Sequence, residues 1–179
     1  MKILVLSDIH GRKLVMEKIL EIIEKEKPDE FFLLGDYLYN GPRNGVPSDY
    51  DGLAVANMLR PLLKKAIFVR GNCDADVDEM VLGTKLARRA SVSYNGRHCV
   101  LVHGDDTDPL FLNLKEGDIL FSGHTHIQVL QEKNGITYCN PGSPSFPKGG
   151  NEASYALFDE LGITIRRLLD SSVIASMDF

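Results

Sequence analysis

The chain has 179 residues, of which 44% are hydrophobic and 25% are charged, and its formal net charge is −5. A chain of this length forms one domain with a substantial core, and its composition excludes disordered and fibrous proteins. The acidic balance argues against an electrostatic grip on nucleic acid or anionic lipid, so stable binding of either is not expected.

The N-terminal residues and the cysteines indicate the compartment. A short apolar run passes directly to Asp8, which is not the pattern of a signal peptide, and no apolar run approaches the roughly 20 residues of a membrane-spanning helix. Cys73, Cys99 and Cys139 are odd in number and lack CxxC spacing, so a disulfide framework is not expected. A soluble protein of the reducing cytoplasm is predicted.

Five strand-like runs of apolar residues recur along the chain, and polar residues follow each of them. Such continuous runs are typical of strands that are buried on both faces. They cover residues 2–7, 31–35, 66–71, 98–102 and 118–123.

Helical patterns separate the first three of these strands. An apolar stripe at i, i+4, i+7 and i+8 predicts an amphipathic helix over 12–27, which Pro28 ends. A second helix is expected over 51–65, kinked or shortened by Pro61. The order β-α-β-α-β predicts parallel strands joined by helical crossovers.

Hairpin signals dominate the second half. Asn95-Gly96 and Asn134-Gly135 each lie between strand-like runs and suit type I′ turns, and Leu161-Gly162 marks a third hairpin. We therefore expect an α/β half followed by antiparallel strands, packed as two sheets between helices in a single domain over residues 1–179. Cys99 and Cys139 are expected as small core residues, and His98 as a structural contact.

The polar residues at the strand ends are candidate metal ligands. Ligands gather at the carboxyl ends of parallel strands, and mixed imidazole, carboxylate and amide donors suit a transition metal. A single Asp after a strand is more often a turn former or a helix cap, but four of the five histidines fall at these positions. The seven candidates are Asp8, His10, Asp36, Asn72, His103, His124 and His126.

The pattern resembles that of the calcineurin-like metallophosphoesterases. Five motifs occur in that family's order: Asp8-Ile9-His10, Gly35-Asp36, Gly71-Asn72-Cys73-Asp74, Val102-His103-Gly104 and Gly123-His124-Thr125-His126. Two further motifs, Gly41-Pro42-Arg43-Asn44 and Asn140-Pro141-Gly142-Ser143, resemble those of the small bacterial YfcE-type phosphodiesterases. The resemblance implies a four-layer α-β-β-α sandwich in which two packed sheets are flanked by helices.

The resemblance also implies how the seven residues divide between two divalent ions. Asp8, His10 and His126 would hold one ion, whereas Asn72, His103 and His124 would hold the other. Asp36 would bridge the two. The family favours Mn²⁺; the donor chemistry also allows Fe²⁺, Zn²⁺ or Ni²⁺ and disfavours Ca²⁺.

Cys73 departs from the pattern of many relatives, which have a histidine after the asparagine as a general acid. Such a proton donor contributes about 10²–10⁴-fold, and a thiol with a reference pKa near 8.5 replaces it poorly. A preference for diesters with good leaving groups is therefore predicted. Asn72, Cys73 and His103 are the predicted catalytic residues, although Cys73 also suits a small packed side chain and Asp74 either a turn or an orienting role.

The long loop over 37–50 follows Asp36 directly, and loops of this length are often functional. Its Asn40 and Arg43, together with Cys73, are the predicted substrate-binding residues, with a solvated loop arginine as the alternative. The apolar run Leu110-Phe111-Leu112 is a candidate surface for a homo-oligomer, and burial in the core explains it equally.

The predicted function is a metal-dependent phosphodiesterase acting on small phosphodiesters. Hydrolysis would proceed by attack of a hydroxide that bridges the two metal ions. The alternatives are a non-catalytic protein-interaction scaffold on the same fold, as in the small retromer subunit, and a phosphomonoesterase. All seven donor positions are filled, which favours the enzyme over the scaffold.

Overall fold

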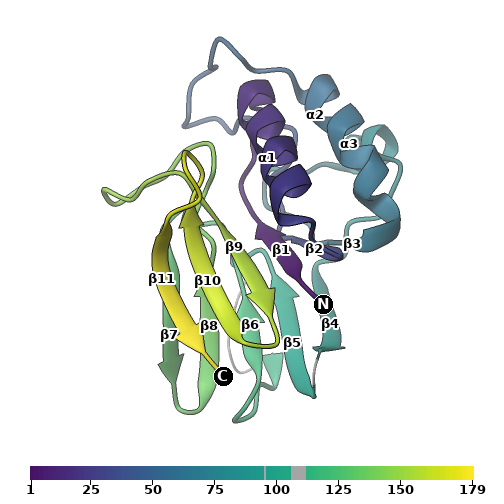
Figure 1. Ribbon diagram of the computed structural model, residues 1–179. Helices are drawn as coiled ribbons and strands as arrows, with labels where there is room; N and C mark the ends of the chain where they lie inside the picture. The colour runs from purple at the N-terminus through teal and green to yellow at the C-terminus, as the bar shows by residue number, and fades with distance from the viewer. Residues whose placement is uncertain (95, 106–111) are drawn as a thin grey trace.

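The computed structural model describes residues 1–94, 96–105 and 112–179. Two β-sheets pack face to face, and helices cover the outer face of the first sheet (Figure 1). The described residues thus form two mixed sheets flanked by helices, in agreement with the predicted fold class.

The first sheet has the strand order β11-β10-β9-β1-β2-β3. The strands β1, β2 and β3 are parallel, as the alternation of strands and helices predicts. Antiparallel pairing of β9 with β1 then extends the sheet into the C-terminal part of the chain. The bounds are β1 Ile3–Leu6, β2 Glu30–Leu33, β3 Ala66–Phe68, β9 Ser154–Asp159, β10 Gly162–Arg167 and β11 Val173–Asp178.

Two of the three α-helices that follow strands β1, β2 and β3 were predicted from the sequence. Helix α1, Lys13–Glu26, buries Met16, Ile19 and Ile22 against the sheet, and its C-cap Lys27 directly precedes Pro28. Pro61 shortens the second predicted helix, as expected, since α2 ends at Leu59 and a 3₁₀ helix follows. The bounds are α2 Gly52–Leu59 and 3₁₀ helix Arg60–Lys65. The short helix α3, Asp76–Leu82, was not predicted.

The second sheet has the strand order β4-β5-β6-β8-β7 and is also mixed. The expectation of antiparallel strands throughout the second half is wrong, because β5 and β6 are parallel and so are β6 and β8. A hairpin turn predicts only that two consecutive strands pair with each other. The parallel pairs arise from longer connections, which carry no such signal. The bounds are β4 Arg89–Tyr94, β5 Arg97–Val102, β6 Ile119–Phe121, β7 Val129–Lys133 and β8 Ile136–Asn140.

All three predicted hairpins are present. Asn134 and Gly135 have φ values of 55° and 72°, which is the left-handed pair that a type I′ turn between β7 and β8 requires. Strands β4 and β5 pair antiparallel around position 95, which lies outside the described residues. In the third hairpin Gly162 is the first residue of β10, so the turn lies one residue earlier than expected.

One core lies between the sheets, and a second core with more buried residues lies between the first sheet and the helices. Phe32 and Phe158 of the first sheet pack on Phe121 of the second, with ring centroids 5.5 and 5.4 Å apart. Cys99 and Cys139 are buried in the same core, as predicted.

The outer face of the second sheet has a smaller cluster of buried residues. Leu112 is buried there, so this part of the candidate oligomer surface is core, whereas Leu110 and Phe111 lie outside the described residues. Among the described helices, none has the length and apolar character needed to cross a membrane.

Candidate metal centre

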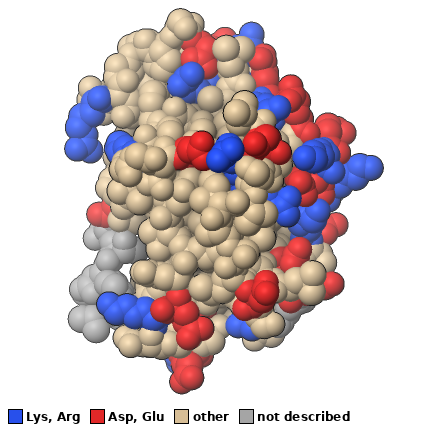
Figure 2. Space-filling model, turned by 60° about the vertical axis from the view of Figure 1, so that its left-hand side comes forward, with Lys and Arg blue, Asp and Glu red and all other residues tan. Residues whose placement is uncertain are grey.

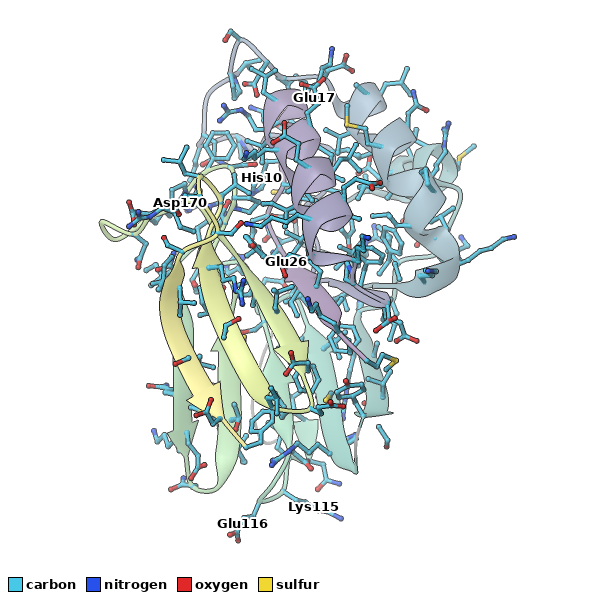
Figure 3. All side chains as sticks on the ribbon, in the orientation of Figure 1. His10, Glu17, Glu26, Lys115, Glu116 and Asp170 are labelled. Atoms are coloured by element: carbon cyan, nitrogen blue, oxygen red, sulfur yellow. The ribbon has the colours of Figure 1, made fainter. Side chains whose placement is uncertain are left out.

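The seven predicted donors meet where strands of both sheets end. Asp8 and His10 follow β1, Asp36 follows β2, and Asn72 follows β3; His103 follows β5, and His124 and His126 follow β6. His10 lies between the helical layer and the sheets (Figure 3).

Five of the seven donors have a left-handed backbone, which residues with a Cβ rarely adopt. Their φ values are 58° for Asp8, 52° for His10, 59° for Asp36, 65° for His124 and 61° for His126. Such conformations cluster at functional sites, where the surrounding structure enforces them.

Two glycines allow the strand ends to approach one another. A Cβ on Gly71 would collide with the Asp36 carboxylate, and one on Gly123 would collide with the Ser7 hydroxyl. The close packing of the metal-binding loops therefore requires glycine at both positions.

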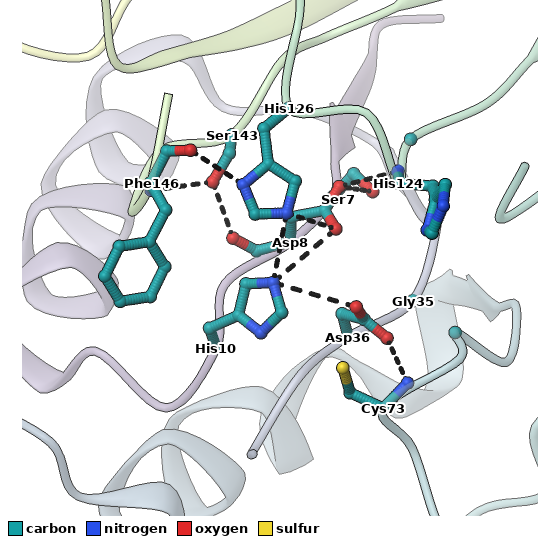
Figure 4. A network of polar contacts seen from close by, with 12 residues as sticks. Ser7, Asp8, His10, Gly35, Asp36, Cys73, His124, His126, Ser143 and Phe146 are labelled. Atoms are coloured by element: carbon teal, nitrogen blue, oxygen red, sulfur yellow. Dashed lines mark hydrogen bonds and ion pairs between the residues drawn. The ribbon is translucent and has the colours of Figure 1, made fainter. Parts of the chain in front are cut away.

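Asp8, His10 and His126 form the first group of donors. The Nε2 atom of His126 lies 3.2 Å from Oδ1 of Asp8, and that of His10 lies 3.6 Å from the same oxygen (Figure 4). The two Nε2 atoms are 3.3 Å apart. Two nitrogens bound to one ion at about 2.0–2.1 Å lie roughly 3 Å apart, so the spacing fits a shared metal.

Hydrogen bonds fix the orientation of three imidazole rings. The Nδ1 atoms donate to backbone carbonyls, at 2.8 Å from His10 to Tyr39, 2.7 Å from His103 to Leu34 and 2.7 Å from His126 to Phe146. Nε2 is therefore the ring nitrogen that faces the centre in each case, which is the arrangement of metal-binding histidines.

The Asp8 carboxylate is oriented in the same way. Its Oδ2 accepts hydrogen bonds from the Ser7 hydroxyl at 2.6 Å and the His124 amide at 3.0 Å. Its buried Oδ1 has no hydrogen-bond donor among the described residues and faces the ring nitrogens. An orphaned carboxylate oxygen that faces two imidazole nitrogens fits a cation between them.

Asp36 lies between this group and the other donors. Its Oδ2 is 3.7 Å from Nε2 of His10 and 3.5 Å from Nε2 of His103. Oδ1 of Asn72 in turn lies 3.0 Å from Nε2 of His103 and 2.7 Å from Nδ1 of His124. One carboxylate therefore contacts both groups of predicted ligands.

The electrostatics of the centre favour cations. Burial alone would lower the pKa of His103, but the Asp36 and Asp8 carboxylates more than offset this effect and raise it to about 9. Burial likewise would raise the pKa of Asp8, yet the neighbouring His10 and His126 hold it well below the usual range. Two carboxylates in one buried centre require nearby positive charge, which a bound cation would supply.

Asp74 holds two of the metal-binding loops together. Its buried carboxylate accepts hydrogen bonds from the backbone amides of Asp36 and Tyr37, both at 2.9 Å, and of Gly71 at 2.7 Å. Burial nevertheless raises its pKa to about 6. Asp74 is therefore a positioning residue that orients its neighbours, and this role goes beyond that of a turn former.

Comparison with known proteins gives the family. Residues 1–161 match the family model of the calcineurin-like phosphoesterase superfamily domain. The chain belongs to this superfamily. It is 39% identical to phosphodiesterase YfcE of Escherichia coli over 179 residues, which are 99% of this chain and 97% of that protein.

Solved structures agree with this assignment. The structure of YfcE from E. coli superposes with a TM-score of 0.94 at 38% identity, with 99% of both chains covered. A Vps29 variant from Entamoeba histolytica has a TM-score of 0.69 at 22% identity, covering 100% of this chain and 99% of that one. The second similarity shows a shared fold alone.

In this phosphoesterase, Cys73 lies at the edge of the centre. Its backbone amide donates to Oδ1 of Asp36 (Figure 4), and its Sγ accepts a 3.4 Å contact from the side-chain amide of Asn72. Burial and the carboxylates of Asp36, Asp74 and Asp8 raise the pKa of the thiol to about 12. The side chain is therefore a neutral thiol at pH 7, which does not suit a covalent nucleophile.

The phosphoesterase has a small cavity of about 90 Å³ over the metal centre. Arg43 and Cys73 line it, as two of the three predicted substrate-binding residues, whereas the Asn40 amide donates to the Gly41 and Gly45 carbonyls within the loop. Asn40 therefore fixes the conformation of the loop that presents Arg43.

Sequence reasoning missed Asn44 and Lys148, which also line this cavity. Asn44 donates to the Asn40 carbonyl at 2.8 Å. Lys148 comes from a distant segment, where the run Pro147-Lys148-Gly149-Gly150 was the signal of a functional loop.

Proposed function

We propose that this phosphoesterase is a metal-dependent phosphodiesterase. The observation that carries the proposal is the centre itself, in which seven donors converge and three imidazoles direct Nε2 towards two buried carboxylates. The extensive identity with a phosphodiesterase of E. coli supports the diester as the substrate.

The proposed cofactor is a pair of divalent ions. Asp8, His10 and His126 would hold one ion; Asn72, His103 and His124 would hold the other; and Asp36 would contact both. Mn²⁺ is the proposed metal, with Fe²⁺, Zn²⁺ and Ni²⁺ as alternatives that the same donors accept. When bound, such ions activate water as a nucleophile and neutralise the charge of the ester.

The remaining site residues would bind and orient the phosphate. Arg43 and Lys148 both line the cavity over the centre, so their cationic groups are positioned to contact the oxygens of a diester. Cys73 faces the same cavity with a neutral thiol, which donates hydrogen bonds weakly. We therefore infer a preference for diesters whose leaving group needs little protonation.

The scaffold alternative shares the fold, and the complete donor set argues against it. A small substrate is also consistent with the surface. Basic and acidic side chains are interspersed on the face drawn in Figure 2, so this face has no continuous basic track of the kind that binds a nucleic acid strand. The cytoplasm and a homo-oligomer remain predictions from the sequence.

The deciding experiment compares bis-p-nitrophenyl phosphate with p-nitrophenyl phosphate, using metal-stripped protein with and without Mn²⁺. We expect Mn²⁺-dependent hydrolysis in which the diester reacts faster, and its loss in Asp36→Asn. Asp170→Asn, an exposed carboxylate elsewhere, is the matched control. Absence of turnover with every divalent metal, in protein shown to be folded, would favour the scaffold.

A further inference from the structure

A second, larger cavity of about 420 Å³ adjoins the metal centre. Asn72 and His103, two of the proposed ligands, form part of its wall. Asn72 also lines the smaller cavity over the centre, so the two spaces adjoin at this residue. A substrate whose phosphate occupies the centre can therefore extend into the larger cavity, whose volume is typical of small-molecule sites.

Three arginines, Arg70, Arg88 and Arg89, line this cavity. They stand out in a chain whose net charge is −5. Arginine presents a planar group of donors that matches phosphate and carboxylate oxygens in pairs. The cavity therefore has the chemistry of an anion site, which the metal centre alone does not explain.

The arginines differ in how they are held. Nη2 of Arg70 lies 2.9 Å from Oδ1 of Asp76, and Nη2 of Arg89 donates to the Leu112 carbonyl at 2.9 Å. Arg88 is exposed, and its guanidinium makes neither a hydrogen bond nor an ion pair with the residues that the structure describes. Arg88 thus offers a complete set of donors to a ligand.

The described lining has two carboxylates, those of Asp74 and Asp105, against three arginines. The Asp74 carboxylate is buried and already accepts three backbone hydrogen bonds. Its oxygens are therefore occupied by backbone amides rather than by an arginine. Asp105 is the other carboxylate on the described lining.

We propose that the preferred substrates are diesters in which one substituent carries a second anionic group, and that Arg88 binds this group. The proposal rests on the proposed function, because it assumes that the diester phosphate lies at the metal centre. Arg70 and Arg89, oriented by their own contacts, line the same cavity.

The test uses two substrates that differ only in the second anionic group. One is the p-nitrophenyl ester of thymidine 5′-phosphate, and the other is its 3′-phosphorylated counterpart, with the same leaving group. With the Mn²⁺-loaded protein we expect kcat/KM to be about tenfold higher for the doubly charged substrate, as for a charge-assisted contact. In Arg88→Gln this ratio should fall to about one, and Arg88→Lys should retain part of it.

Lys65→Gln is the control, because it removes an exposed charge that precedes β3, at the end of the strand opposite the metal centre. It should keep the tenfold ratio. Calorimetric binding of thymidine 3′,5′-bisphosphate and thymidine 5′-phosphate gives the same comparison without turnover. A 3′-O-carboxymethyl counterpart distinguishes a carboxylate from a phosphate as the second group.

The outcomes separate the two proposals. Failure to hydrolyse bis-p-nitrophenyl phosphate with any divalent metal would reject the proposed function. Hydrolysis of that diester with equal kcat/KM for the two thymidine substrates would reject the role of Arg88 alone. A preference that persists unchanged in Arg88→Gln would also overturn it.

Discussion

The backbone amide of Cys73 donates a 2.8 Å hydrogen bond to Oδ1 of Asp36, the carboxylate that both groups of predicted ligands share. This contact fixes the thiol beside the centre, at the position where many relatives have a histidine. The side chain at position 73 is therefore placed to affect the departure of the leaving group.

Cys73→His should restore a general acid. We expect kcat/KM for diesters with poor leaving groups to rise about 10–100-fold, with little change for p-nitrophenyl esters, because only poor leaving groups need the proton. The measurement is the slope of log kcat/KM against leaving-group pKa, with Cys73→Ser as the size-matched control. An unchanged slope in Cys73→His would contradict the assignment.

Asp74→Asn should destabilise the protein and weaken metal binding. One carboxylate oxygen becomes an amide donor facing backbone N–H groups, which costs about 2 kcal/mol in the free energy of unfolding. Urea unfolding of the metal-free protein measures the loss, and calorimetric titration with Mn²⁺ measures the affinity. Asp76→Asn, the exposed neighbour, should change both much less; equal effects of the two variants would show that the three amide contacts are unimportant.

Mn²⁺ should stabilise the folded chain. At about 100 times its dissociation constant, an ion that binds only the folded state adds about 2.7 kcal/mol per site, which is roughly 5–10 °C in Tm for a domain of this size. Calorimetric unfolding should show this shift in the wild type and in His98→Gln, whose imidazole binds Asp118 instead. The centre would be misassigned if Asp36→Asn kept the full shift.

Asp118→Asn tests a site remote from the centre, since its neighbours Lys115 and Glu116 lie at the opposite end of the molecule from His10 (Figure 3). Burial alone would raise the pKa of Asp118. Hydrogen bonds from the Lys115 amide and His98 lower it by more than burial raises it, so the pKa is below the ordinary value. A carboxyl with a depressed pKa stabilises the fold above its unfolded pKa of about 3.9 and loses this effect as pH falls through the folded pKa.

The Asp118→Asn variant should therefore be less stable by about 1 kcal/mol at pH 7, and the difference from the wild type should shrink below about pH 4. Urea midpoints across this pH range provide the measurement, with the exposed Glu116→Gln as control. A difference that stays constant with pH would exclude the ionised carboxylate as its source.

The sequence predicts best what neighbouring residues determine. Alternating strands and helices predict β1, β2 and β3 as parallel, because a helical crossover leaves few other arrangements. Paired Asn-Gly turns predict hairpins correctly but give no information about β5 and β6, whose parallel pairing joins strands that are further apart in the chain. The seven donors could be predicted because each one follows the end of a strand, and the carboxyl ends of parallel strands lie together at one edge of a sheet.

The remaining site residues depend on tertiary structure. Lys148 reaches the cavity from a loop more than one hundred positions after Arg43, and no local pattern relates the two. Arg88 and Arg89 are adjacent basic residues, and such a pair is ordinarily interpreted as solvated. Only the fold shows that Arg88 lines a cavity together with residues of β4 and of the loop after β3. Long-range contacts of this kind are not encoded in periodicity or spacing.

The left-handed backbone of five donors has a consequence for the stability of the protein. Each such residue costs roughly 1–2 kcal/mol in backbone conformation. The rest of the fold must offset this cost, and hydrogen bonds such as those from His10 to Tyr39 and from His126 to Phe146 hold the rings in place. The centre therefore lowers the stability of the chain at positions where glycine would be the less strained residue.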